Sequence, residues 1–149
     1  MIIEFHKWLT DAEGNLYKKE CSSKKFAGYT GRKFVLESII FKVVSRLEWQ
    51  EAQEAGVFRG SPLDVADGFI HLSSAAQVVS TVQNYFAGRD DLVLVSVDTE
   101  RLGDTLRWEV SRGGALFPHI YGDLPLTSVL KAVPLELKKD GTHVFPDGI

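Results

Sequence analysis

Two histidines in the second half of the chain are the first candidates for chemistry. His71 lies in the segment GFIHLS and His119 in FPHIYG. A histidine changes charge near neutral pH, so either imidazole could transfer a proton or hold a substrate hydroxyl. Alternation along the predicted strand 68–73 places Phe69 on the same face as His71. The alternative for His71, which apolar residues flank, is a half-buried structural histidine. The alternative for His119 is that Phe117 and Tyr121 fill the core while the imidazole faces water.

Glu109 is the third candidate for a catalytic residue. It directly follows Trp108 in the segment LRWEV, where we predict a strand, so the two side chains point to opposite faces. Trp108 is the natural core residue, which directs Glu109 towards solvent or a cleft. A carboxylate there could stabilise a developing cation or act as a base. The alternative is an exposed strand glutamate without a chemical role.

Several neighbours of these residues are candidates for ligand binding. Arg112, in the Gly-rich SRGG turn, could pair with a phosphate or carboxylate, although a surface arginine is the alternative. Phe117 and Tyr121 flank His119 and could form the walls of a pocket for a planar ring. A loop is predicted for this part of the chain, from 111 to 125, because Gly, Pro and aromatic residues dominate it.

A metal site is an alternative use of the same residues. His71 and His119 together with Glu109 or Asp67 could provide three ligands, as in catalytic zinc sites. Their spacing matches no compact motif such as H-E-x-x-H, so we predict no metal ligand. The single cysteine, Cys21, offers no disulfide and no thiolate zinc site.

Composition excludes several classes of protein. The 149 residues fit one domain, with 44% hydrophobic and 25% charged residues. Residues 1–40 hold seven basic and five acidic side chains, which leaves an acidic remainder of ten against fifteen. Nucleic-acid binding is therefore disfavoured, because it requires a concentrated basic face. The sequence has no apolar run long enough to span a membrane and no secretory signal pattern, so we expect a cytoplasmic protein.

The elements that must position these residues begin near Ile39. IIFKVV is typical of a buried strand, and Ser45 with Glu48 forms a capping box that predicts a helix over 46–55, ended by Gly56. The next segments are predicted to be a loop (FRGSPLDVAD), a strand (68–73) and a helix (75–86) that begins after Ser73 or Ser74 and turns Val78, Val82, Tyr85 and Phe86 inward.

Strands dominate the expected second half. LVLVSVD at 92–98 is the strongest strand pattern and indicates the centre of the sheet. A further strand is expected around 105–110, and a last strand or short helix in TSVLKAVPLEL. Short strands mixed with two main helices favour an α+β fold with a small mixed or antiparallel split sheet. We expect a basic, poorly ordered extension over 1–38, one domain over 39–137 and a polar tail over 138–149.

Four segments together resemble a known family. FKVVSRLEWQEAQEAGVFRGSPLDVADGFIHLS, DDLVLVSVD, LRWE and FPHIYG occur in the order seen in a small family of bacterial and plant proteins described only as a domain of unknown function. The resemblance covers about residues 40–135. That family is grouped by fold with the ADP-ribosyltransferases, which break the nicotinamide glycosidic bond of NAD and pass ADP-ribose to an acceptor.

The resemblance implies roles for particular residues. Lys42 or Ser45 lies on the first strand, where the superfamily often has histidine. His71 and Ser73 lie on the second strand, and Glu109 takes the place of the late glutamate that stabilises an oxocarbenium-like ribose. His71, Glu109 and His119 are thus the implied catalytic residues, and NAD is the implied substrate. The implied ligand-binding residues are Lys42, Ser73, Trp108, Arg112, Phe117 and Tyr121.

Three hypotheses follow for the function. The first is an ADP-ribosyltransferase-like domain that binds NAD or a related nucleotide. The second is a non-catalytic module that uses the same pocket to hold a small ligand or a protein, and the third is a metal-assisted hydrolase that uses both histidines. The two enzymatic hypotheses require His71, Glu109 and His119 to converge in space.

Overall fold

The computed structural model describes residues 7–10, 16–19 and 37–149. In the first forty residues it pairs strand β1 (Lys7–Thr10) with β2 (Leu16–Lys19), antiparallel. No strand was predicted in this segment. Apart from Glu37 and Ser38, the rest of the predicted extension over 1–38, including Cys21, lies outside the described residues. No helix in the described part of the chain is long and apolar enough to cross a membrane.

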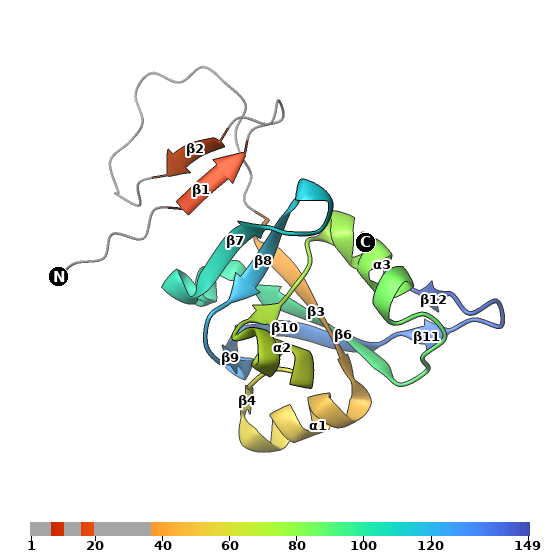
Figure 1. The fold of residues 1–149 in the computed structure, drawn as a ribbon. Helices are drawn as coiled ribbons and strands as arrows, with labels where there is room; N and C mark the ends of the chain where they lie inside the picture. The colour runs from red at the N-terminus through yellow and green to blue at the C-terminus, as the bar shows by residue number, and fades with distance from the viewer. Residues whose placement is uncertain (1–6, 11–15, 20–36) are drawn as a thin grey trace.

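A three-stranded antiparallel sheet forms the centre of the fold (Figure 1). Strand β6 (Leu92–Asp98) lies between β3 (Ile39–Ser45) and β10 (Val129–Pro134). Both β3 and the central position of β6 were predicted, and the structure confirms them. The reason is local: β-branched and aliphatic side chains run through both strands, and nearly all of them are buried.

A second antiparallel sheet carries the candidate residues. Strand β8 (Leu116–Ile120) lies between β5 (Ile70–His71) and β7 (Leu106–Val110). The two sheets meet at Phe41 and Ser73, whose backbone N–H groups each donate to the other's carbonyl at 2.8 Å. Two short pairs complete the strands: β4 (Val57–Phe58) with β9 (Leu124–Pro125), and β11 (Glu136–Leu137) with β12 (His143–Val144).

Three helices accompany the strands. The capping box of Ser45 and Glu48 begins α1 (Arg46–Ala55), and Gly56 ends it in a left-handed conformation with φ of 72°, as predicted. Helix α3 (Ala75–Tyr85) begins after Ser74 and buries Val78 and Val82. Tyr85 was predicted to face inward, which is wrong: the last turn of α3 reaches past the core, and this side chain is mostly exposed.

Two segments predicted as loops contain regular structure. FRGSPLDVAD includes helix α2 (Pro62–Asp67), which a second capping box begins at Ser61 and Asp64. The segment 111–125 includes β8 and β9, so its prediction as an irregular loop is wrong. Its glycines and prolines indicate a loop locally, but residues 117–120 are all buried, and pairing on both sides decides the conformation of β8.

The core has two parts, one on each side of the central sheet. Ile40 and Val44 face the second sheet, while Phe41 and Val43 face α3. The C-terminal segment contributes to the α3 side, where Phe145 and Ile149 pack, although only a polar tail was predicted there. The alternation along β3 places Lys42 on the same side as Ile40 and Val44, towards the second sheet.

Candidate functional site

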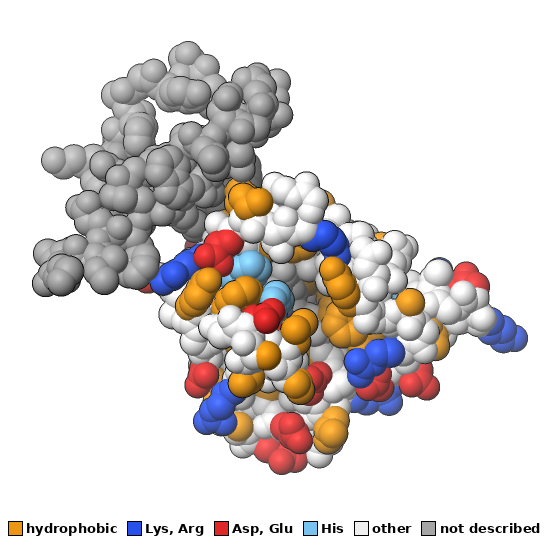
Figure 2. Space-filling model, in the orientation of Figure 1, with side chains coloured by type: hydrophobic (Ala, Val, Ile, Leu, Met, Phe, Trp, Pro, Cys, Tyr) orange, Lys and Arg blue, Asp and Glu red, His pale blue; other side chains and the backbone are white. Residues whose placement is uncertain are grey.

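His71 and His119 lie directly opposite each other on paired strands. Their Cα atoms are register partners in the β5–β8 pair, so both side chains project from the same face of the second sheet. The ring centroids are 5.5 Å apart and the ring planes meet at 74°. Histidine side chains are visible on the face shown in Figure 2, bordered by hydrophobic and acidic groups.

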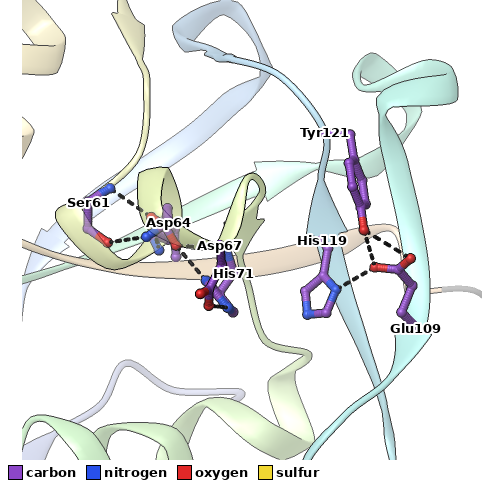
Figure 3. Close-up of polar contacts among 8 residues, drawn as sticks. Ser61, Asp64, Asp67, His71, Glu109, His119 and Tyr121 are labelled. Atoms are coloured by element: carbon purple, nitrogen blue, oxygen red, sulfur yellow. Dashed lines mark hydrogen bonds and ion pairs between the residues drawn. The ribbon is translucent and has the colours of Figure 1, made fainter.

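A buried carboxylate holds the first of the two imidazoles. Nδ1 of His71 lies 2.7 Å from Oδ1 of Asp64, and Asp64 is only 2% exposed. The capping box of α2 positions this carboxylate: Oδ2 of Asp64 accepts from the backbone N–H of Ser61 at 2.8 Å. The carboxylate that completes the capping box of α2 therefore also orients His71 (Figure 3).

Lys42 lies behind this pair, inside the protein. Its Nζ donates to Oδ2 of Asp64 at 2.7 Å, and both side chains are almost fully buried. Burial lowers the pKa of Lys42 despite the opposing effect of the Asp64 charge. For Asp64, burial raises the pKa, but the hydrogen bond from His71 and the charge of Lys42 together bring it well below its ordinary value. Lys42, expected to bind ligand, thus supports Asp64 instead.

A second carboxylate contacts His71 from the other side of the ring. Nε2 of His71 lies 3.1 Å from Oδ2 of Asp67, the last residue of α2. Asp67 is 44% exposed, unlike Asp64. His71 is therefore fixed by one buried carboxylate and touched by one that solvent reaches.

Glu109 and Tyr121 surround the second imidazole. Nδ1 of His119 lies 2.7 Å from Oε2 of Glu109, and the Tyr121 hydroxyl donates to both Glu109 oxygens at 3.0 and 3.1 Å. Burial and the hydrogen bond to Glu109 raise the pKa of Tyr121. His119 is buried while Glu109 is partly open to solvent. Glu109 was predicted to point towards solvent or a cleft rather than the core, and its partly exposed side chain fits that prediction.

Alternation along three strands explains why these residues share a face. In β7, Arg107 and Glu109 point the same way, and Arg107 is the register partner of His119. Phe69 joins them from the residue before β5: its ring centroid lies 4.7 Å from His71, 4.4 Å from His119 and 5.4 Å from Tyr121. The Arg107 guanidinium lies over the Tyr121 ring at 4.2 Å. The Phe69 ring thus packs against both imidazoles and against Tyr121.

Four other predicted ligand-binding residues are placed differently. Trp108 packs against the core on the opposite face of β7, so its predicted inward direction holds, but it does not join the histidines. Ser73 is buried and its Oγ lies 3.1 Å from Oγ1 of Thr81 on α3. Arg112 donates to Oγ of Ser80 at 3.2 Å and lies over the ring of Phe117, which is buried. These contacts belong to the packing of α3.

Three residues of this face were not predicted to belong to the site: Asp64, Phe69 and Arg107. The sequence does contain a signal for Asp64, since Ser61-Pro62-Leu63-Asp64 is a capping box with proline at the first helical position. Phe69 was placed on the His71 face by alternation but not recognised as part of the site. Nothing in the sequence indicates that Lys42, 22 residues earlier, pairs with Asp64.

The side chains of this face are suited to acid–base chemistry. Each imidazole has Nδ1 against a carboxylate, an arrangement that orients a histidine for proton transfer. Among the described residues, no group of three or more His, Cys, Asp or Glu side chains is placed to hold a metal ion. A separate cavity of about 150 Å³ lies against α1 and β4, and neither histidine lines it.

Comparison with known proteins identifies relatives of the chain. Residues 43–132 match the family described as "Protein of unknown function (DUF952)". A crystal structure of protein CC0527 from Caulobacter crescentus is 46% identical in sequence, with a TM-score of 0.69, and covers 71% of this chain and 93% of that one. A solution NMR structure of CC0527 has a TM-score of 0.65 at 46% identity, over 71% and 91% of the two chains. No curated protein matches the chain.

Proposed function

The chain belongs to the DUF952 family, and from that premise we propose that its two histidine–carboxylate pairs form the site of an ADP-ribosyltransferase-like domain that binds NAD or a related nucleotide. One observation carries the proposal: His71 and His119 face each other at 5.5 Å, each with Nδ1 at 2.7 Å from a carboxylate. Such pairs orient an imidazole for proton transfer.

The proposed reaction uses the Glu109–His119 pair directly. The bond between the ribose and nicotinamide breaks, and nicotinamide leaves with the bonding electrons as a neutral molecule. The hydroxyl of an acceptor or of water attacks the cationic ribose, and Nε2 of His119 takes the proton. Glu109, which lies 2.7 Å from Nδ1, stabilises the resulting imidazolium and the positive charge on the ribose.

Aromatic residues support binding of a planar group at the same place. Phe69 and Tyr121 lie beside the imidazoles, and Arg107 lies over the Tyr121 ring. A flat heteroaromatic ring can stack against such side chains. The partly exposed carboxylates of Asp67 and Glu109 add negative charge, which favours a ligand portion that is cationic, such as the pyridinium ring of NAD.

The test is calorimetric titration of NAD and of ADP-ribose into the full chain. We expect binding with a dissociation constant of about 1 mM or tighter, the range that calorimetry detects at practical concentrations. Glu109→Gln and His119→Gln should weaken it, while the exposed Glu54→Gln on α1 serves as the matched control. No heat at millimolar NAD would overturn the nucleotide proposal. Binding without any release of nicotinamide would favour a non-catalytic module on the same site.

A further inference from the structure

Asp64 accepts as many hydrogen bonds as a carboxylate can hold in one plane. Oδ2 receives Nζ of Lys42 at 2.7 Å and the backbone N–H of Ser61 at 2.8 Å. Oδ1 lies 3.0 Å from the backbone N of His71 and 2.7 Å from Nδ1 of the same residue. An ionised carboxylate can only accept, and three of its neighbours can only donate. The fourth neighbour, Nδ1 of His71, must therefore carry a proton.

The other nitrogen of the ring has a different environment. Nε2 of His71 lies 3.1 Å from Oδ2 of Asp67, which is 44% exposed. Asp67 is also an acceptor when ionised, so this contact is favourable when Nε2 is protonated and repulsive when it is not. Nε2 is thus the nitrogen at which a proton can come and go, because its partner can turn away into solvent.

We propose that Lys42 and Asp64 are positioning residues that keep the proton of His71 on Nδ1, so that Nε2 is the atom that exchanges a proton with Asp67 or with a bound ligand. A catalytic role for this proton rests on the proposed function. The protonation pattern of His71 itself does not depend on a bound nucleotide.

The two imidazoles would then differ in what contacts Nε2. His119 has Nδ1 against Glu109, which accepts from Tyr121 and so holds a proton on that Nδ1 as well. Nε2 of His71 lies 3.1 Å from the Asp67 carboxylate, whereas Nε2 of His119 has no hydrogen-bond partner among the described residues and can accept a proton from a ligand. The groups that face His71 from the surrounding elements are Lys42, Asp64, Asp67, Phe69 and His119.

Long-range ¹H–¹⁵N correlation spectra of the histidine side chains in the full chain test this directly, because Nδ1 and Nε2 give separate signals. His143 is the internal reference: its Nε2 lies 2.6 Å from the backbone carbonyl of Arg89, an obligatory acceptor, so His143 must be protonated on Nε2. In the neutral form of His71 we expect the proton on Nδ1 and none on Nε2.

Two variants separate positioning from simple packing. In Asp64→Asn the amide oxygen stays with the Lys42 ammonium, so the NH₂ group faces Nδ1 of His71. The imidazole must then accept at Nδ1, and its proton should move to Nε2. In Asp67→Asn the proton should stay on Nδ1. The unchanged His143 signal reports that each variant is folded.

The outcomes are exclusive. A neutral wild-type His71 that carries its proton on Nε2 would overturn the inference. So would an unchanged Nδ1 proton in folded Asp64→Asn. If Asp64→Asn does not fold, the wild-type and Asp67→Asn spectra still show which nitrogen of His71 carries the proton. A failure to bind NAD would leave these spectra unaffected, so the two proposals can fail separately.

Discussion

His71 and His119 are register partners whose rings lie 5.5 Å apart, and each has its own carboxylate on the side away from the other ring (Figure 3). Antiparallel pairing of β5 with β8 is what brings these residues, distant in sequence, to one place. Asp64 belongs to a helix and Glu109 to the neighbouring strand β7. The site therefore depends on four elements meeting: α2, β5, β7 and β8.

Replacing Glu109 should affect chemistry more than folding. Glu109→Gln removes the charge that stabilises the His119 imidazolium, so nicotinamide release from NAD should fall by about 10²–10³-fold. The thermal midpoint should change little, because Glu109 is 36% exposed. The measurement is chromatographic quantification of nicotinamide, with Glu54→Gln as the control. Equal rates for the two variants would remove Glu109 from the mechanism.

Replacing Lys42 should destabilise the fold strongly. Lys42→Met leaves the Asp64 carboxylate buried without its counter-charge, and breaking a buried pair costs about 3–5 kcal/mol. Urea denaturation measures the loss in free energy of unfolding. Lys131→Met, at an exposed position of β10, should stay within about 0.5 kcal/mol of the wild type. The double variant Lys42→Met/Asp64→Asn should lose less than the sum of the single losses, and strict additivity would contradict the pairing.

Asp64 should also make the protein sensitive to acid. Its pKa is lower when folded than when unfolded, so the unfolded chain binds more protons as the pH falls below about 4, the ordinary aspartate value. The contribution of Asp64 to stability is thus present above that pH and is lost progressively below it. Urea midpoints measured between pH 7 and pH 2 should fall less steeply for Asp64→Asn than for the wild type and the exposed Asp104→Asn. Parallel curves would contradict the assignment.

Phe69 should matter for ligand binding. Its ring contacts both imidazoles and Tyr121, and aromatic pairs contribute about 0.5–1.5 kcal/mol each. Phe69→Leu should weaken NAD binding by about tenfold, equivalent to about 1.4 kcal/mol, in the same calorimetric titration. Phe145→Leu, in the core beside α3, is the control and should bind as the wild type does. Unchanged affinity in Phe69→Leu would exclude this ring from the site.

The sequence alone predicted the elements whose signals are local. The strands β3 and β6 and the helix α1 follow from continuous apolar runs, a capping box and a glycine C-cap, all of which act within a few residues. Alternation also placed Glu109 opposite Trp108 and His71 beside Phe69. Strand β8 was not predicted, because glycine and proline around it indicate a loop and only pairing with β5 and β7 overrides that preference.

The residues that contact the histidines could not be predicted from local sequence patterns. Asp64 is seven residues from His71 and 22 from Lys42, and the contact depends on the α2 helix lying against both strands. Lys42 is a further example. Its place on the first strand was predicted from the sequence. In the structure it is buried among Ile40, Val44 and Phe58, where it faces Asp64 instead of a ligand.

The most direct test of the central claim is an NMR titration of the full chain with NAD, read at the histidine side chains. If the two pairs form a nucleotide site, the signals of His71 and His119 should shift together and saturate. Those of His143, bonded to the Arg89 carbonyl at the far side of the central sheet, should stay in place. Shifts at neither His71 nor His119 at millimolar NAD, or equal shifts at all three histidines, would contradict the account.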